Sequence, residues 1–333
     1  MAGVIRNVKA PAVLAAVLVL TAGAGAAPVA GLQPVHVAIP QPTLFTTAAP
    51  YHVGAAKGIY AANGISVTPI FTKGGGDNVQ AVVAGSADIG VESGPMAILA
   101  AYVHGAPVKI IAASSTGLDL YWFSKGGSPY KTPRDLAGQK VGYSEPGSSS
   151  DLALRALNKI LVAQGLKPAV GEPLGGPPAQ LAAVKTGQVA AGFSAPPVFL
   201  DMVKSGDLQI VARASTLGEY RNVAIRVDFA DSRFLAAHPD AVRRYLTAVR
   251  EIWAYIFAHR DEAVSIWKEK AQLKADPALL KTVFDFYTPS MLVLSPLGGE
   301  DKIIEDSVAF KFIPAPLTPK QRAEVFDLQY VPK

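Results

Sequence analysis

The feature that most constrains this chain is the alternation of short apolar segments, which are typical of strands, with segments of helical periodicity. In the first part of the chain the predicted elements are strand 35–39, helix 50–62, strand 66–71, helix 78–84, strand 87–92, helix 95–103 and strand 108–114. Such alternation favours a mostly parallel sheet flanked by helices, that is, an α/β fold. Ligands of these sheets bind beyond the carboxyl ends of the strands, at the loops that enter helices.

A second unit of the same kind follows, and the last third of the chain is mostly helical. The predicted elements of the second unit are strand 140–144, helix 148–164, helix 178–185, strand 189–193 and strand 209–214. Beyond them, apolar residues recur at spacings of three and four from Val242 to Phe257, which indicates one long helix with Pro239 in its first turn. We interpret Tyr245 and Trp253, on its apolar face, as core residues.

Composition narrows the possible functions. The 333 residues are 50% hydrophobic and 17% charged, so a large core is available and about two domains are expected. The absence of cysteine excludes disulfides, thiolate metal sites and a cysteine nucleophile. The net charge of +5 comes from scattered basic residues, which disfavours nucleic-acid binding. The five histidines form no metal-ligand pair and no phosphate-binding glycine motif occurs, so no cofactor is expected.

The first residues have the pattern of an export signal. Arg6 and Lys9 precede a short apolar segment at 10–21, and small residues at 24–26 fit a cleavage site. A membrane anchor is the alternative interpretation, but the apolar segment is short for a membrane span of about 20 residues. We therefore expect residues 1–26 to be a cleaved signal peptide and the mature protein to be periplasmic.

Small polar residues stand at three predicted helix starts. They are Thr46 and Thr47, Ser93 before Gly94, and the serines at 148–150. Hydroxyl groups and free backbone N–H groups at helix N-termini suit anions. Three such clusters at the ligand end of two α/β units therefore favour a shared anion site. The alternative for each cluster is a plain helix cap.

Two further patterns keep alternatives open. The glycines at 74–76 precede a helix and form either a plain turn or a ligand loop. Glu92 could pair with Asp119 or Glu145 for acid–base chemistry. Nothing in the sequence places these carboxyl groups together, so solvated or structural roles are the expectation for them.

Four segments of the chain follow one another in a recognisable order. They are APYHVGAAKGIYAANGISVTPI (49–70), NVQAVVAGSADIGVESGPMAIL (78–99), KTPRDLAGQKVGYSEPGSSS (131–150) and LAAVKTGQVAAGFSAPP (181–197). In order and spacing they resemble the periplasmic substrate-binding proteins of nitrate, sulfonate and taurine import systems, a group that also contains binders of thiamine-pyrimidine precursors. The resemblance implies a two-lobed type II periplasmic binding protein, each lobe a mixed sheet flanked by helices. Lobe 1 would comprise residues 27–124 and 222–333, and lobe 2 residues 125–221.

The resemblance also implies a ligand site between the lobes. The implied ligand-binding residues are Gln41, Phe45, Thr46, Gly76, Asn78, Ser93, Gly94, Ser148, Ser149, Ser150, Pro196 and Asn222. Many relatives have an acidic residue where this chain has Ala195. The loss of that partner for a ligand ammonium group favours a plain anion or an aromatic acid, of sulfonate or carboxylate type, over taurine and other amino-type ligands. Phe45, Tyr51 and Trp122 would form either an aromatic wall or part of the core.

The function that the resemblance implies is that of a receptor without enzymatic activity. Such a receptor, usually a monomer, delivers a small molecule to the membrane subunits of an ABC permease. One alternative is a sensory receptor that presents its closed form to a membrane signalling protein, which the sequence does not exclude. The other is an enzyme on the same fold. The enzymes that resemble this family depend on functional cysteines, and this chain has none.

Overall fold

The computed structural model describes residues 31–333, so the expected signal peptide lies outside the described residues. The largest sheet has the strand order β2-β1-β3-β10-β4. The bounds of its strands are β1 (Gln33–Pro40), β2 (Ile65–Thr72), β3 (Ile89–Ser93), β4 (Val108–Thr116) and β10 (Ala224–Asp231). β1 runs parallel to β2 and β3, whereas β10 runs antiparallel to β3 and β4. The sheet is therefore mixed, and one of its inner strands comes from the last third of the chain.

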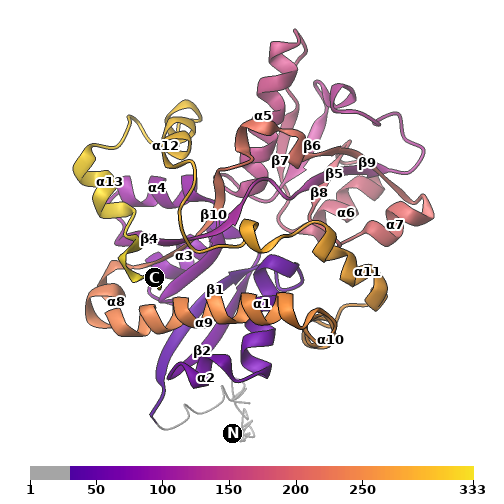
Figure 1. Ribbon diagram of the computed structural model, residues 1–333. Helices are drawn as coiled ribbons and strands as arrows, with labels where there is room; N and C mark the ends of the chain where they lie inside the picture. The colour runs from indigo at the N-terminus through magenta and orange to yellow at the C-terminus, as the bar shows by residue number, and fades with distance from the viewer. Residues whose placement is uncertain (1–30) are drawn as a thin grey trace, which may run out of the picture.

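Helices cover both faces of this large sheet (Figure 1). One face packs against α1 (Phe45–Ala56), α2 (Ile59–Ala62), α9 (Pro239–Ala258) and α10 (Arg260–Lys270). The other face packs against α3 (Gly75–Val83), α4 (Pro95–Val103) and α12 (Glu300–Ala309). Because side chains alternate along a strand, Val37 joins the first core and Ala38 the second. The remaining helices of this part are α8 (Ser232–Ala237), α11 (Pro277–Lys281) and α13 (Pro319–Val325).

Two smaller sheets form the second part of the molecule, at the upper right of Figure 1. Their strand orders are β8-β5-β9 and β6-β7. The elements are β5 (Tyr121–Lys125), β6 (Lys140–Tyr143), β7 (Val170–Pro173), β8 (Gly192–Ser194), β9 (Leu208–Arg213), α5 (Ser149–Ala163), α6 (Pro177–Thr186) and α7 (Leu200–Ser205). A bridge between Val141 and Ala191 links the two small sheets. The second part therefore has a framework of its own.

The chain passes between the large sheet and the small sheets twice. It leaves the large sheet after Thr116 and enters the small sheet at Tyr121, and it returns between Tyr220 and Ala224. β5 thus pairs entirely within the second part, although residues 121–124 were expected at the end of lobe 1.

Most predicted elements occur with small differences at their ends, and the differences have physical causes. Helix 95–103 and the long helix that starts at Pro239 are confirmed. The predicted helix 50–62 is instead two helices: α1 begins at Phe45 with Pro50 inside it, and the left-handed Gly58 separates it from α2. β10 was not predicted, because three charged residues interrupt its apolar pattern although the whole strand is buried.

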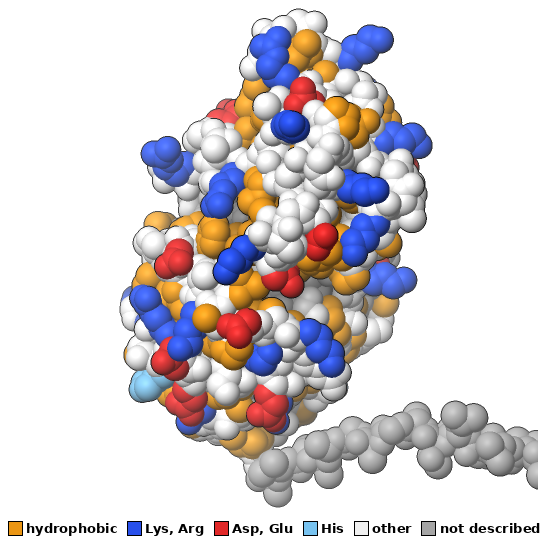
Figure 2. Space-filling view, turned by 90° about the vertical axis from the view of Figure 1, so that its right-hand side faces the viewer, with side chains coloured by type: hydrophobic (Ala, Val, Ile, Leu, Met, Phe, Trp, Pro, Cys, Tyr) orange, Lys and Arg blue, Asp and Glu red, His pale blue; other side chains and the backbone are white. Residues whose placement is uncertain are grey.

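None of the helices within residues 31–333 is both long and apolar enough to cross a membrane. On the face that Figure 2 shows, basic and acidic side chains are interspersed over both parts of the molecule.

Candidate ligand-binding site

Arg226 is a buried cation that contacts both parts of the molecule. It belongs to β10 and is 5% exposed. Its guanidinium donates two hydrogen bonds to Asp119, with Nη1–Oδ2 and Nη2–Oδ1 distances of 2.9 and 2.8 Å. Its Nε donates to the hydroxyl of Ser149 at 3.1 Å. Because Ser149 is the first residue of α5, this arginine joins the large sheet to the second part.

Asp119 lies in the segment that connects β4 to β5, where it neutralises Arg226. The hydroxyl of Tyr287, which is itself buried, also donates a hydrogen bond to Asp119. A bidentate arginine and a phenol together compensate much of the cost of burying this carboxylate. The arrangement fixes the guanidinium at the end of the large sheet.

Glu92 and Asp228 form the acidic side of the site. Glu92 is 6% exposed and has a left-handed φ of 50° at the end of β3. Its N–H donates to Oδ1 of Asp228 at 3.1 Å, and the Ser114 hydroxyl donates to the same oxygen at 2.7 Å. Oε1 of Glu92 accepts a hydrogen bond from Ser115 at 2.6 Å. Its Oε2 lies 3.6 Å from Nη1 of Arg226 and accepts no hydrogen bond from the described residues.

The burial of these groups shifts their pKa values. Burial raises the pKa of Glu92, against the opposing effects of Arg226 and the neighbouring serine hydroxyls. Burial also raises the pKa of Asp228 to about 7. Burial alone would lower the pKa of Arg226, but the carboxylates of Asp119 and Glu92 raise it far above its usual value. The site therefore combines a permanent cation with two carboxyl groups whose proton affinity is raised.

Two predicted ligand residues serve the large sheet. Asn78 is fully buried, and its Nδ2 donates to the carbonyl oxygens of Ala38 at 3.0 Å and Val91 at 2.9 Å, which braces β1 against β3. Ser93 is also buried and donates to the carbonyl oxygen of Val91 at 3.1 Å. Asn78 thus links two strands, whereas the hydroxyl of Ser93 makes its hydrogen bond within β3.

Two predicted glycines lie where the first part meets the second. The N–H of Gly76 donates to Oε1 of Glu145 at 2.7 Å. A Cβ atom added to Gly94 would lie 2.2 Å from the carbonyl oxygen of Gly147, so only glycine permits this approach. The glycines at 74–76 are thus more than a plain turn, since Glu145 contacts them from the other part of the molecule.

Phe45, an expected ligand contact, lies in the core. It is 1% exposed. Its ring packs against the aromatic rings of Trp253, Trp267, Phe284 and Tyr287. Trp122 is buried as well, whereas Tyr51 is half-buried. An aromatic side chain at the first position of α1 therefore anchors the helix.

Thr46 and Gln41 lie at the start of α1 and at the end of β1. Thr46 lines a cavity of about 30 Å³ beneath α1, together with Glu92 and Asp228. The side chain of Gln41 lies against Gly176 of the second part and donates to the carbonyl oxygen of Lys73. Both residues are therefore close to the junction of the two parts.

The three serines at the start of α5 have three different roles. Ser148 is the helix cap and accepts a hydrogen bond from the N–H of Asp151 at 3.2 Å. Ser150 accepts from the N–H of Ser144 at 2.9 Å, which holds the preceding loop. Ser149 accepts from Arg226, as described above. The cap interpretation therefore holds for Ser148, and Ser149 is the member that faces the buried arginine.

The last two predicted residues lie at the two crossings. Pro196 and Asp119 line a cavity of about 70 Å³ next to the first crossing. Asn222 is exposed in the second crossing, where its carbonyl oxygen packs against Gly298. The structure thus places Asn222 at the surface. Arg226, four residues later, is the side chain from this segment that enters the site.

Arg226 was not predicted as a site residue, and Asp119 was considered only as a possible acid–base partner of Glu92. An arginine within the apolar segment AIRVDF at 224–229 is a usable signal, because such a residue is rarely buried without an acidic partner. The partner itself lies 107 residues away in the sequence, so no local pattern identifies it.

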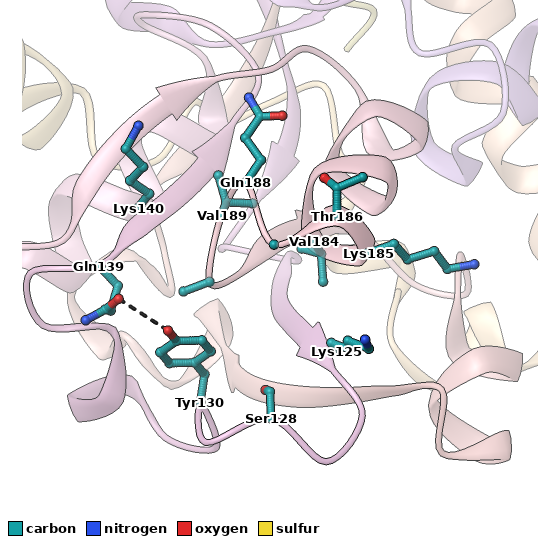
Figure 3. A pocket seen from close by; sticks show the side chains of 12 residues that line it. Lys125, Ser128, Tyr130, Gln139, Lys140, Val184, Lys185, Thr186, Gln188 and Val189 are labelled. Carbon is teal, nitrogen blue, oxygen red and sulfur yellow. Dashed lines mark hydrogen bonds between the residues drawn. The ribbon is translucent and has the colours of Figure 1, made fainter.

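A hollow of the second part lies away from this junction. It has a volume of about 380 Å³ and is lined by β6, the end of α6 and the segment after β5. Figure 3 shows that Lys140 and Lys185 extend to opposite sides of the hollow. The lysines do not converge on one point, and all lining residues come from a single part of the molecule. We therefore place the candidate ligand site at Arg226.

The structure combines a mixed sheet with a second α/β part, which is inserted in the chain between β4 and β10, and a polar site lies between the two parts. This is the fold of the periplasmic binding proteins. The Escherichia coli protein SsuA, a periplasmic aliphatic sulphonate binding protein, superimposes with a TM-score of 0.69 at 17% identity, over 90% of this chain and 99% of that one. The periplasmic nitrate-binding protein NrtA of Synechocystis superimposes with a TM-score of 0.68 at 18% identity, over 88% and 85%.

The sequence assigns the family directly. The chain belongs to the NMT1/THI5-like family, whose model matches residues 46–263. A curated relative is the riboflavin-binding protein RibY of Chloroflexus aurantiacus, 28% identical over 225 residues. That match covers 66% of this chain and 61% of the length of RibY. The family resemblance inferred from the four sequence segments is confirmed.

Proposed function

We propose that this protein is a periplasmic solute receptor that binds a small organic anion, of sulfonate or carboxylate type, between two lobes and delivers it to an ABC permease. The observation that carries the proposal is the buried Arg226, which contacts Asp119 and Glu92 on one side and Ser149 on the other. A site whose polar groups come from two parts of a molecule is suited to ligand-driven closure. The sulphonate- and nitrate-binding proteins with this fold support the same function.

The anionic group would bind at the start of α5. The N-terminus of a helix carries roughly half a positive charge and offers N–H groups without intrahelical acceptors. Ser149 adds a hydroxyl group there, and Arg226 adds a cation at 3.1 Å from that hydroxyl. Asp119 already neutralises part of the arginine charge, so the helix and the serine have to contribute to anion binding.

The lobes of the proposed receptor are those expected, 27–124 with 222–333 and 125–221, except that the first crossing lies at 117–120, because β5 pairs within the second part. Export is part of the same proposal, and the permease subunits and a monomeric state belong to it as well. Mass spectrometry of the protein secreted by its host should give a mature N-terminus within a few residues of Ala27. Recovery of exported protein that retains Met1 would contradict the cleavage of the signal peptide.

A binding panel tests the receptor function. Isothermal titration calorimetry with aliphatic sulfonates, aromatic and aliphatic carboxylates, nitrate, pyrimidines and riboflavin should identify a solute that binds with one-to-one stoichiometry. A ligand at 100 times its dissociation constant adds about 2.7 kcal/mol to the free energy of unfolding, which a melting experiment measures independently. Turnover of a bound compound, or binding of none of these classes, would contradict the proposal.

A further inference from the structure

The start of α3 depends on a hydrogen-bond acceptor from outside the helix. Its N-cap is Gly74, which has no side chain that could accept a hydrogen bond from the first N–H groups. These N–H groups have no acceptor within the helix either, because the chain before them is not helical. From the sequence, the glycines at 74–76 form either a plain turn or a ligand loop, and in the structure a carboxylate of the chain itself lies against them.

Glu145, in the loop between β6 and α5 of the second part, supplies the acceptor. Its Oε1 accepts a hydrogen bond from the N–H of Gly76 at 2.7 Å. The contact requires glycine, because a Cβ atom at Gly76 would lie 2.9 Å from the carboxyl carbon of Glu145, and a Cβ atom at Gly74 would lie closer still to its Oε1. The glycine triplet therefore fits a carboxylate that comes from the other part of the molecule.

A second contact of the same kind runs in the opposite direction across the junction. Gln41, at the end of β1, extends its side chain to Gly176, which is the N-cap of α6 in the second part. A Cβ atom at Gly176 would overlap with the carboxamide of Gln41. Gln41 is buried, and its carboxamide also donates to the carbonyl oxygen of Lys73. Each part therefore places one side chain against a glycine at the start of a helix in the other part.

Glu145 makes its contact at an electrostatic cost. Burial raises the pKa of its carboxyl group, and the negative charge of Asp77 adds to this effect, whereas the N–H groups of Gly76 and Asp77 oppose it. A raised pKa means that the surroundings favour the neutral form of the group over the charged form. The start of α3 therefore needs the acceptor oxygen of residue 145 and not its charge, so a neutral acceptor of the same shape should serve equally well.

From these contacts we propose that Glu145 is a positioning residue for closure: its Oε1 caps α3 across the junction and, with the reciprocal contact of Gln41, stabilises the closed arrangement of the two parts. The inference deepens the proposed receptor function and rests on it. Because the contact includes no atom of a solute, it acts before a solute binds. The affinity for a solute that requires the closed arrangement depends on the population of that arrangement. Loss of the contact should therefore weaken the binding of all such solutes by one common factor.

Spin labels measure the closed population without any solute. The chain has no cysteine, so Gln80→Cys on α3 and Lys185→Cys on α6, both at exposed positions, give one label on each part. In this doubly labelled protein, Glu145→Ala should lower the ratio of short to long distances between the labels about two- to tenfold, the range for one neutral hydrogen bond. Glu145→Gln keeps an acceptor oxygen and should retain the ratio of the unsubstituted protein.

Two further variants make the comparison specific. Alanine favours a helix over glycine, so Gly76→Ala should not destabilise α3, yet its Cβ atom would displace the Glu145 carboxylate and should lower the distance ratio as Glu145→Ala does. The control is Glu172→Ala, which removes a carboxylate that pairs with Lys140 within the second part, and it should leave the ratio unchanged. An unchanged ratio in Glu145→Ala or Gly76→Ala, or equal losses in Glu145→Ala and Glu145→Gln, would overturn the proposal.

The solutes of the binding panel separate this inference from the receptor function. Every solute that binds should lose affinity by the same factor in Glu145→Ala, whatever its chemical class, because the residue acts on closure and does not touch the solute. A loss confined to one chemical class would overturn the proposal. If the distance ratio falls in Glu145→Ala but the panel yields no solute, the receptor function fails and the role of Glu145 in closure stands. If a solute binds but the ratio does not change, the receptor function stands and this inference fails.

Discussion

Arg226 is the residue on which the junction of the two parts depends most. Removal of one member of a buried ion pair leaves the other charge without compensation, at a cost of about 3–5 kcal/mol. Arg226→Ala should therefore lose this much free energy of unfolding in urea denaturation, because Asp119 and Tyr287 remain buried. The control is Arg243→Ala, whose partner Asp240 is exposed. It should lose less than about 1 kcal/mol, and equal losses in both variants would contradict the assigned role.

Asp228 should make stability depend on pH. Its pKa rises from 3.8 to about 7 on burial, so between these values the folded protein binds more protons than the unfolded chain. The contribution of Asp228 to stability is therefore present below about pH 4 and is lost as the pH rises toward 7, at up to roughly 1.4 kcal/mol per pH unit. Asp228→Asn should remove this loss.

The wild type and Asp228→Asn share all other titrating residues. The difference between their unfolding free energies therefore reports on the ionisation of Asp228. Glu92 changes in the same direction as Asp228, whereas Arg226 stays charged and Tyr60 and Tyr245 stay neutral in this range. Chemical denaturation at pH 5, 6, 7 and 8 measures the difference in unfolding free energy. A difference that does not change with pH would show that Asp228 is ionised throughout.

At the scale of single elements, serine substitutions at the start of α5 distinguish helix capping from ligand binding. Ser148→Ala should cost about 1 kcal/mol of stability, because it removes the acceptor for the N–H of Asp151. It should leave the affinity for the anion found by the binding panel nearly unchanged. Ser149→Ala keeps the cap but removes the contact with Arg226. Its affinity should fall about ten- to a hundredfold, the range for a hydrogen bond to a charged group.

Melting temperature and calorimetric affinity, measured together on both variants, test this division. Ser150→Ala is the third member of the series and should affect the loop before the helix through Ser144. If all three variants lose stability but bind the anion normally, the serines serve only the fold.

Elements with a clear apolar period were predictable, and elements that combine charge with burial were not. The period of α9 and the proline at its first position defined that helix. In β10, Arg226, Asp228 and Asp231 interrupt the pattern, and only partners from distant segments make their burial possible. The same reason explains why the sequence indicated the loops of the site but not its central cation. Glu92, Asp119 and Arg226 are far apart in the sequence, so no local sequence pattern indicates that their side chains converge.

At the scale of the whole molecule, Gly94 closely approaches Gly147 of the second part, so we expect a larger side chain at Gly94 to hold the two parts apart. A Cβ atom at Gly94 would meet the Gly147 carbonyl oxygen at 2.2 Å, so Gly94→Ala should prevent the closed arrangement. Small-angle scattering should then give a larger radius of gyration than for the wild type with saturating solute. The control is Gly218→Ala, since no atom lies within 4 Å of a Cβ there. An unchanged radius for Gly94→Ala would contradict a closure through this contact.

The position of β10 in the large sheet has a consequence for the synthesis of the chain. β10 lies between β3 and β4, yet it is the last strand to be made. The large sheet therefore stays incomplete until residue 231 of 333 has left the ribosome, although all strands of the small sheets are present by residue 213. If the protein is exported as proposed, the missing inner strand would delay compaction of the N-terminal segment before the chain crosses the membrane. The order of synthesis would then help the nascent chain to remain competent for translocation.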